Sequence, residues 1–444
     1  MHETIFAPVT AYGTSAISVF RFSGNRSKNI LKELIKSNKI PLARKLVLKK
    51  VFNPATNELL DVCLICWMPK PNSFTGEDCF EVQCHGGIAT MQAFTEAFSR
   101  IKGLRFAEAG EFSKRAIING KIDLVQAEAI NEIILAETEK QRKLNLQQLN
   151  KGLSIPINLW RNNIINTLSK IEAAIDFSDE DGVPEKIDIR TEIKKISKDI
   201  TKVVEKGNKY ELITTGTKIA LTGPPNSGKS SLFNSIIKKQ KSIVTKIPGT
   251  TRDVVEKKIN LRGSLVILLD TAGIRETKNL VEKEGIKKAK KAIKEADIVL
   301  KIADISKINN KIETRFFKNK NWVVLNKIDK LKKEKSLKYQ KNENIFFVSA
   351  KTGKGIKGLL KKIHQHILNE TKEEERGDYF FTNERQKRDL KKALANLQRA
   401  VEEKDEEIVA EYLRAASGNL ERILGKIDIE DVLGDIFSSF CIGK

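Results

Sequence analysis

Residues 218–237 read KIALTGPPNSGKSSLFNSII, and this stretch decides the fold of the middle of the chain. The segment KIAL predicts a short buried strand and SLFNSII predicts a helix. Between them, Gly223 to Ser230 match the pattern G-x-x-x-x-G-K-[ST], whose backbone N–H groups curve around phosphate oxygens beside the positive end of a helix. We therefore expect Lys229 to reach the β- and γ-phosphates of a nucleotide and Ser230 to ligate Mg²⁺.

Around this loop, residues 216 to about 368 alternate short apolar segments with helical patterns. The apolar segments are KIALTG, SLVILLD, DIVLKIAD, NWVVLNK and IFFVSA. Strands that alternate with helices are typical of βαβ units and a parallel sheet. The sequence therefore predicts that these segments form one parallel sheet, with the phosphate-binding loop at the end of its first strand.

Polar motifs follow several of these strands. Asp270 to Gly273 (DTAG) end SLVILLD, where Asp270 can hold Mg²⁺ through water and the Gly273 N–H can sense the γ-phosphate. Gly249 to Asp253 (GTTRD) lie between the two phosphate motifs, and there Thr251 can complete the Mg²⁺ shell. Asn326 to Asp329 (NKID) and Ser349 to Lys351 (SAK) follow the last two strands.

The NKID motif selects the base. Guanine presents N1–H and N2–H₂ donors on one edge, and the carboxylate of Asp329 can accept from both. Adenine presents an acceptor at N1 and has no N2 amine, so it would be rejected. Backbone N–H groups of residues 349–351 are expected to close over guanine O6. The five motifs in this order resemble the translation-factor-like class of GTPases.

The group that orients the attacking water is a separate question. Ras-like enzymes use a Gln directly after D-x-x-G, but here that position is the apolar Ile274. Two candidates remain, namely Glu282 and a monovalent cation near the amide oxygen of Asn226. From the residues alone, a solvated carboxylate on a charged helix is the better interpretation of Glu282.

The flanking segments differ in pattern from the middle of the chain. Residues 1–119 contain strand-like segments at 16–24, 45–52, 61–68 and 79–87, with helical patterns at 25–37, 88–102 and 108–119. Residues 120–214 and 372–444 are predominantly helical, with interruptions expected at Pro156, at Asp179 to Pro184, and at Gly418 and Gly425. Helix before and after the α/β module, residues 215–371, predicts a helical domain into which that module is inserted.

The amino-acid composition indicates which kinds of molecule the chain could bind. Lys and Arg number 80 against 57 Asp and Glu in 444 residues, a net charge of +23. This balance favours a polyanion such as nucleic acid, although a Lys-rich surface can also reflect an AT-rich genome. No stretch of 18 uncharged apolar residues and no secretory signal is present, so we expect a cytoplasmic protein without a membrane span.

Four of the five cysteines, Cys63, Cys66, Cys79 and Cys84, cluster in sequence. The spacing of Cys63 and Cys66 matches half a zinc site. However, DVCLICWM predicts a strand, on which residues i and i+3 point to opposite faces. We therefore expect buried thiols rather than metal ligands.

Further motifs give a more specific result. In chain order, PNSFTGEDCFEVQCHGG (71–87), AEAGEFSKRAIINGKIDLVQAEAI (107–130), EAAIDF (172–177), GTTRD, DTAGIRE and FSSFCIGK (437–444) resemble the bacterial MnmE (TrmE) family of tRNA-modification GTPases over the whole chain. The resemblance implies a multidomain α/β and all-α fold: a folate-binding-like α/β domain that dimerises (1–119), a discontinuous helical domain (120–214 and 372–444) and an inserted P-loop GTPase domain (215–371).

The resemblance also implies an activity. Members of the family are potassium-activated GTPases that form homodimers and work with the FAD-containing MnmG in a heterotetramer-type complex. Together they build the carboxymethylaminomethyl or aminomethyl group at C5 of the tRNA wobble uridine, using a one-carbon unit from 5-formyl- or 5,10-methylene-tetrahydrofolate. Two other functions share the G motifs: a ribosome-assembly GTPase switch, and a structural GTP-dependent dimer without one-carbon chemistry.

Carried over by position, the resemblance assigns site residues. It places K⁺ on Asn226, Thr245, Ile247 and Thr250, and Mg²⁺ on Ser230 and Thr251. It makes Glu282 the residue that orients water, which reverses the interpretation above. It puts tetrahydrofolate on Arg21, Glu81, Lys121 and Lys444, with the Cys441 thiol close by as a catalytic residue of the modification, whereas the residues alone give Cys441 a helix-packing role. The full expected GTP-binding set is Asn226, Ser227, Gly228, Lys229, Ser230, Ser231, Thr245, Lys246, Ile247, Pro248, Gly249, Thr250, Thr251, Asp270, Thr271, Ala272, Gly273, Asn326, Lys327, Asp329, Ser349, Ala350 and Lys351.

Overall fold

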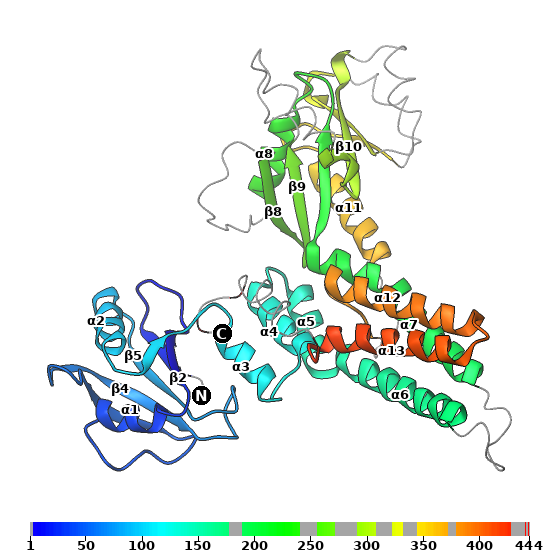
Figure 1. Ribbon diagram of the computed structural model, residues 1–444. Helices are drawn as coiled ribbons and strands as arrows, with labels where there is room; N and C mark the ends of the chain where they lie inside the picture. Colours follow the sequence, from blue (N-terminus) through cyan, green and yellow to red (C-terminus); the bar gives the residue numbers. More distant parts are fainter. Residues whose placement is uncertain are drawn as a thin grey trace, which may run out of the picture. The chain divides into compact units, whose positions relative to one another are not determined.

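The chain folds as two units, each built from segments far apart in sequence (Figure 1). The computed structural model describes residues 3–176, 189–239, 255–270, 291–307, 322–331, 344–371 and 379–427, together with 440 and 443. The first unit comprises Met1–Asn131, Gln148–Ser197 and Asp389–Lys444, and the second comprises Glu132–Gln147 and Lys198–Arg388. Within the described ranges, no helix has both the length and the hydrophobicity needed to cross a membrane.

The first unit contains a six-stranded sheet of order β3-β4-β5-β2-β1-β6. Neighbouring strands are antiparallel, except that β1 and β6 are parallel. The four strands predicted from sequence are confirmed, whereas the two short strands at one edge were not predicted. The bounds are β1 Thr4–Pro8, β2 Ile17–Ser23, β3 Leu46–Phe52, β4 Leu59–Met68, β5 Cys79–His85 and β6 Leu104–Phe106.

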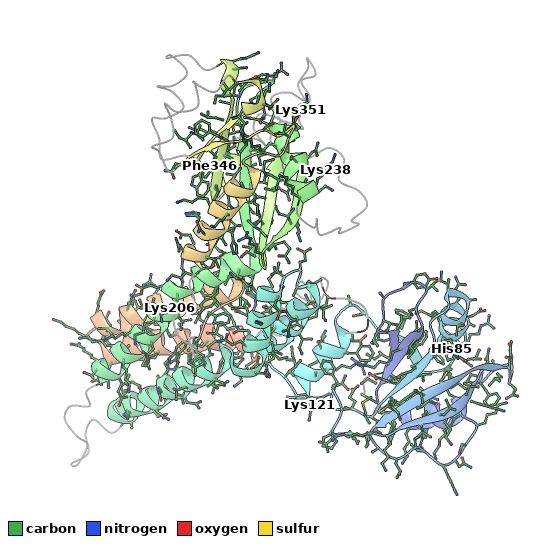
Figure 2. All side chains as sticks on the ribbon, turned by 180° about the vertical axis from the view of Figure 1, so that it is seen from behind. His85, Lys121, Lys206, Lys238, Phe346 and Lys351 are labelled. Atoms are coloured by element: carbon green, nitrogen blue, oxygen red, sulfur yellow. The ribbon has the colours of Figure 1, made fainter. Side chains whose placement is uncertain are left out.

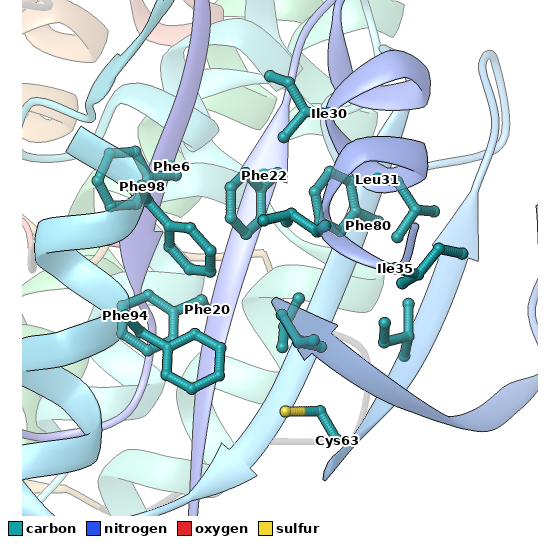
Figure 3. Close-up of a cluster of buried hydrophobic side chains, with 14 of the residues drawn as sticks. Phe6, Phe20, Phe22, Ile30, Leu31, Ile35, Cys63, Phe80, Phe94 and Phe98 are labelled. Atoms are coloured by element: carbon teal, nitrogen blue, oxygen red, sulfur yellow. The ribbon is translucent and has the colours of Figure 1, made fainter. Parts of the chain in front are cut away.

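Helices α1 (Ser27–Leu34) and α2 (Ile88–Ser99) contribute to the core on one face of this sheet. Phenylalanines from both layers fill the space between them, as Figure 3 shows. Phe22 stacks on Phe80 at 4.1 Å between ring centroids, and Phe98 of α2 meets Phe22 edge-on at 4.9 Å. Because side chains alternate along a strand, the residues between these aromatics, including Arg21 and Glu81, lie on the opposite face.

The cysteines follow the same alternation. On β4, Cys63 is buried in the aromatic core, while Cys66 is half-buried on the other face. Burial raises the pKa of both thiols, and it raises that of Cys84 to about 11. The thiols are therefore protonated at neutral pH. In the part of the chain that the structure describes, His, Cys, Asp and Glu side chains form no group of three that could hold a metal.

Helices dominate the rest of the first unit and the flanks of the second. Their bounds are α3 Glu111–Ile118, α4 Leu124–Leu135, α5 Glu139–Lys151, α6 Ser154–Asp176, α7 Ile189–Thr215, α12 Glu384–Glu402 and α13 Glu406–Leu424. The chain passes from one unit to the other inside each of α4, α5, α7 and α12.

Three details of the helical prediction needed correction. The stretch from Leu124 to Lys151, in which no interruption was expected, is two helices, because Thr138 and Gln141 form a capping box that starts a new helix: the Gln141 N–H donates to Thr138 Oγ1, and the Thr138 N–H donates to Gln141 Oε1. Pro156 does not interrupt a helix but lies in the first turn of α6, where its missing N–H has no helical partner to lose. Gly418 lies within α13, whereas Gly425 ends it in the left-handed conformation, as expected.

The second unit contains a sheet of order β12-β11-β10-β7-β9-β8. Five strands are parallel, as predicted, but β8 pairs antiparallel with β9. The reason is local: Arg262 and Gly263, at φ 52° and 90°, form the two-residue turn of a hairpin. The bounds are β7 Thr217–Thr222, β8 Val255–Leu261, β9 Ser264–Asp270, β10 Ile298–Asp304, β11 Trp322–Asn326 and β12 Ile345–Phe347.

Helices α8 (Lys229–Lys239) and α11 (Ile356–Glu370) pack against one face of this sheet (Figure 1). Their apolar sides bury Leu232, Ile236 and Ile363 against strand residues such as Leu221 and Leu300. The carboxyl ends of parallel strands lie at one edge of a sheet, so β7, β9, β10 and β11 present their last residues together. That edge carries the nucleotide motifs.

Candidate functional site

The phosphate-binding loop joins β7 to α8 and depends on two glycines. Gly223 has φ +149°, and a Cβ there would collide with the carbonyl oxygen of Ile302 in β10. Gly228 has φ +91°, and a Cβ there would collide with the Asn326 amide. Only glycine therefore fits at either position, because both the backbone conformation and the close approach of other strand ends exclude a side chain.

Lys229 begins α8 and folds back over the loop. Its Nζ donates to the carbonyl oxygens of Gly223 at 2.9 Å and of Pro224 at 3.0 Å. Burial lowers the pKa of Lys229, and the nearby Asp270 carboxylate partly opposes that shift. Asp270 is buried at the end of β9, whereas Ser230 and Ser231 are exposed in the first turn of α8. The structure thus brings the predicted phosphate and Mg²⁺ residues of these two motifs together.

Asn326 connects the phosphate loop to the loop after β12. Its Nδ2 donates to the Ser227 carbonyl oxygen at 3.0 Å. Its Oδ1 accepts from the N–H groups of Lys327 at 2.8 Å and Ala350 at 3.0 Å. A single buried amide side chain therefore fixes the spacing between the loop expected to hold phosphates and the loops expected to hold the base.

Asp329, which is predicted to read the guanine edge, is exposed at the tip of the turn after β11. Ser349 Oγ donates to its Oδ1 at 2.5 Å, and this hydrogen bond is the main reason that the pKa of Asp329 lies below its usual value. The Thr352 N–H in turn donates to Ser349 Oγ at 3.1 Å. Lys351, labelled in Figure 2, is exposed in the same loop. The carboxylate is therefore ionised, oriented and accessible.

Sequence reasoning missed one member of this edge, Asp304. It is buried at the end of β10, in register with Asn326 on the adjacent strand. Its Oδ2 lies 2.7 Å from Lys327 Nζ, which also donates to the Asn226 carbonyl oxygen at 2.6 Å. The signal was present, because DIVLKIAD ends in a carboxylate at the same place as the strand that ends in Asp270.

The remaining predicted GTP and metal residues lie outside the described residues. They are Thr245, Lys246, Ile247, Pro248, Gly249, Thr250, Thr251, Thr271, Ala272, Gly273 and Glu282.

The residues expected at a folate site gather in the first unit. Arg21 of β2 and Glu81 of β5 are in register on adjacent strands, and both Nε and Nη2 of Arg21 lie 2.9 Å from Glu81 Oε1. The guanidinium carbon of Arg21 also lies 5.5 Å from the Phe74 ring centroid and 5.9 Å from that of Phe112. Arg21 is thus held between two aromatic rings and directed at Glu81.

Lys121 (Figure 2) lies beside the loop that carries Phe74. Its Cδ is 3.2 Å from the position that a Cβ at Gly76 would occupy. The neighbouring Asn119 donates its Nδ2 to the Thr75 carbonyl oxygen at 2.7 Å, and Arg115 pairs with Glu77 at 3.0 Å. These contacts attach residues 74–77 to the end of α3, so Lys121 is fixed at the side of this loop.

The C-terminal segment returns to the same sheet. Phe440 packs against Ile117, Leu124 and Ala127. A Cβ added at Gly443 would lie 2.5 Å from the Pro8 carbonyl oxygen, at the end of the strand that pairs with β2. Cys441 and Lys444 lie outside the described residues, but their neighbours therefore lie close to the Arg21 strand.

Comparison with known proteins agrees with this architecture. A model of the "GTP-binding protein TrmE N-terminus" matches residues 4–121, and a model of the "MnmE helical domain" matches residues 124–441. The tRNA modification GTPase MnmE of Rickettsia bellii is 38% identical over 100% of both chains, and that of Rickettsia prowazekii is 37% identical over 100% of both chains. The chain belongs to the MnmE family.

Membership of the MnmE family, together with the two sheets, confirms the predicted fold class. The helical-domain model begins at α4 and ends after Phe440, so the match encloses the whole sheet that carries the P-loop. Among solved structures, a variant of Aquifex aeolicus Era bound to GDP and AlF₄⁻ is 26% identical, covering 43% of this chain and 69% of that chain with a TM-score of 0.27. The G domain of the Thermotoga maritima FeoB iron transporter is 29% identical, covering 34% and 98%, with a TM-score of 0.24.

Proposed function

We propose that this MnmE-family chain is a potassium-activated GTPase which, as a homodimer with the FAD-containing MnmG, modifies C5 of the tRNA wobble uridine with a tetrahydrofolate one-carbon unit. The GTPase part rests on the arrangement of Lys229, Asn326 and Asp329 at one sheet edge. There Asn326 is hydrogen-bonded to the phosphate loop, and Ser349 is hydrogen-bonded to Asp329. Phosphate-binding and guanine-reading groups are thereby held at a fixed separation. We also propose domain boundaries at residues 119, 214 and 371.

The residues at this edge suit a nucleotide with Mg²⁺. The exposed hydroxyl of Ser230 stands at the N-terminus of α8, and the buried Asp270 carboxylate ends the neighbouring strand. Oxygen donors of this kind are those that Mg²⁺ prefers, and Thr251 would complete the set. When bound, the ion neutralises charge on the phosphates. The chain itself contributes the Lys229 ammonium and the loop N–H groups, which orient the terminal phosphate.

For K⁺, the described part of the chain offers Asn226. It adopts the left-handed φ of 61° in the phosphate loop and is exposed, while its backbone carbonyl is held by Lys327. An amide oxygen is a suitable donor for this ion, and Thr245, Ile247 and Thr250 would supply the others. Bound K⁺ would add positive charge beside the phosphates, the role played elsewhere by an arginine. Glu282 would orient the attacking water.

The folate part rests on the Arg21–Glu81 pair. Nε and Nη2 of Arg21 both lie 2.9 Å from Glu81 Oε1, so Oε2 would be the oxygen that accepts from an amine edge of a pterin ring. Arg21 then serves mainly to hold Glu81, and Lys121, with Lys444, would meet the glutamyl carboxylates. The C-terminal segment that packs at Pro8 would bring the Cys441 thiol close to the same pocket.

The homodimer is supported by apolar side chains that are exposed, among the described residues, on part of one sheet face. On the Glu81 face, Leu46 and Leu48 of β3 are 55% and 62% exposed, and Val62 of β4 and Ile17 of β2 are also exposed. Apolar side chains that gather on one face of a sheet mark an interaction surface. We propose that a second copy of this sheet covers it.

The net charge of +23 suits a polyanion such as tRNA.

Steady-state GTP hydrolysis in K⁺ and in Na⁺ tests the mechanism. We expect much faster turnover in K⁺, and loss of turnover with retained nucleotide affinity in Glu282→Gln. Equal rates in both salts would discard the cation. Deletion of the gene tests the pathway: loss of the modified wobble uridine supports the proposal, whereas intact tRNA with a ribosomal subunit defect supports the ribosome-assembly function.

A further inference from the structure

Asp304 directs the Lys327 side chain. Its Oδ2 lies 2.7 Å from Lys327 Nζ, and its Oδ1 accepts from both the N–H and the hydroxyl of Ser306, at 3.1 and 2.7 Å. The residue is only 7% exposed. All three hydrogen bonds run to a carboxylate largely removed from water, where charge-assisted bonds are strongest.

Lys327 in turn holds the phosphate loop. Its Nζ donates to the Asn226 carbonyl oxygen at 2.6 Å, while the adjacent Asn326 donates to the next carbonyl, that of Ser227, at 3.0 Å. The last residue of β11 and the residue after it therefore bind two consecutive carbonyls of the loop. Asp329 follows Lys327 by two residues, so the position of the base-reading carboxylate relative to the phosphates depends on these two hydrogen bonds.

A lysine side chain has four rotatable bonds and a point charge, so it holds a direction only when a partner fixes it. Burial alone would raise the pKa of Asp304, but hydrogen bonds from Lys327 and Ser306 bring that pKa below its usual value. The carboxylate therefore stays charged at neutral pH and keeps the ammonium group in place.

We propose that Asp304 is a positioning residue for guanine nucleotides: through Lys327 it sets the distance between the phosphate loop and Asp329. This inference rests on the proposed GTP site. Asp304 touches neither the base nor the phosphates in this account, so its effect on binding must pass through Lys327.

A double-mutant cycle on GDP affinity tests the proposal. Fluorescent GDP is titrated into the full-length wild type, Asp304→Asn, Lys327→Met and the double variant. We expect Asp304→Asn to weaken GDP binding about tenfold, because its charge-assisted hydrogen bond with Lys327 is lost, and we expect Lys327→Met, which also loses the bond to the Asn226 carbonyl, to weaken it at least as much. The double variant should be no weaker than the worse single variant, since both changes break the same contact.

Asp297→Asn is the matched control. Asp297 precedes the first residue of the same strand and accepts from the Lys218 N–H at 2.8 Å. It lies at the opposite end of β10 from Asp304, so GDP affinity should be unchanged. Melting temperatures of all variants are measured in parallel, to separate loss of stability from loss of positioning.

Three results would overturn the inference: unchanged GDP affinity in Asp304→Asn, losses that multiply in the double variant, or a lower melting temperature with normal affinity. If Asp304→Asn does not fold, Ser306→Ala removes one of the bonds that orient the carboxylate. We expect it to bind GDP about two- to threefold more weakly, and an unchanged affinity would again overturn the inference. A wild type that does not bind GDP refutes the proposed function instead.

Discussion

Ser349 donates its hydroxyl hydrogen to Asp329 across 2.5 Å, which joins the loop after β12 to the turn after β11. The bond lowers the pKa of Asp329 and gives its exposed carboxylate a fixed direction. A guanine that approaches this carboxylate meets an acceptor that is already oriented.

Ser349→Ala should therefore weaken GDP binding about three- to tenfold at neutral pH, because the carboxylate must be ordered when the base binds. The pKa of Asp329 should rise toward its usual value. Titration with fluorescent GDP measures the first effect. Thr352→Ala is the control, since the Thr352 Oγ1 accepts from the Lys354 N–H and leaves the Ser349–Asp329 bond intact, and this variant should bind GDP like the wild type.

Asp329→Asn should exchange the base preference. An amide can accept from one donor of guanine but presents its own N–H₂ to the other, whereas xanthine offers an acceptor there. We expect GDP affinity to fall about a hundredfold or more, and affinity for xanthosine diphosphate to rise. Competition between the two nucleotides measures this. Retained guanine selectivity would exclude Asp329 as the base reader, while Lys330→Gln at the adjacent exposed position should change neither affinity.

Glu111 should make the first unit sensitive to acid. Burial would raise its pKa, but hydrogen bonds from Arg105, the Glu108 N–H and Arg115 outweigh burial and lower it to about 2. The folded pKa is thus below the unfolded value, so its stabilisation is complete above about pH 4.5 and is lost as the pH falls toward 2.

Glu111→Gln should accordingly lower the free energy of unfolding by about 2–3 kcal/mol at pH 7. The difference from the wild type should shrink progressively between about pH 4.5 and pH 2. Urea unfolding at several pH values measures it. Glu96→Gln breaks only the exposed pair with Arg100 and should cost about 0.5 kcal/mol or less. A pH-independent difference would contradict the assignment.

Glycine is required at position 207 because of side-chain packing and not because of its backbone conformation. It lies within α7, where Ala would normally be the better residue, but a Cβ there would collide with the Phe381 ring. Gly207→Ala should therefore destabilise the protein by about 1–3 kcal/mol through overpacking. Gly418 within α13 is the contrast, because a Cβ there meets no heavy atom within 4 Å among the described residues.

Gly418→Ala should stabilise the fold by about 0.5–1 kcal/mol. Thermal unfolding of both variants checks the pair. If the two substitutions shift the melting temperature in the same direction, the packing argument for Gly207 fails.

The features predictable from sequence were those in which local chemistry decides structure. The phosphate loop needs Gly223 and Gly228, and the strands β9, β10 and β11 are apolar runs that end in Asp270, Asp304 and Asn326. Such signals survive without knowledge of the fold. The antiparallel β8 did not stand out, because VEKKINL has polar or charged residues at four of its seven positions and three of them are consecutive. The strand β6 has only three residues, which is too short to show a period.

Contacts between residues that are far apart in the sequence could not be predicted from it. The sequence marks Lys327 but not its partner Asp304, which lies 23 positions earlier in the chain. Likewise, Arg115 reaches both Glu77 and Glu111, and only the folded sheet and α3 bring those carboxylates together. The family resemblance named Arg21 and Glu81 as ligand contacts, but the structure adds that they bind one another.

Gly443, near the end of the chain, lies beside Pro8 and Val9, near its beginning. The ribosome therefore synthesises β1 more than four hundred residues before it adds Gly443, which contacts the end of that strand. A nascent chain that has already folded its amino-terminal sheet would therefore still lack the contact between Gly443 and the end of β1.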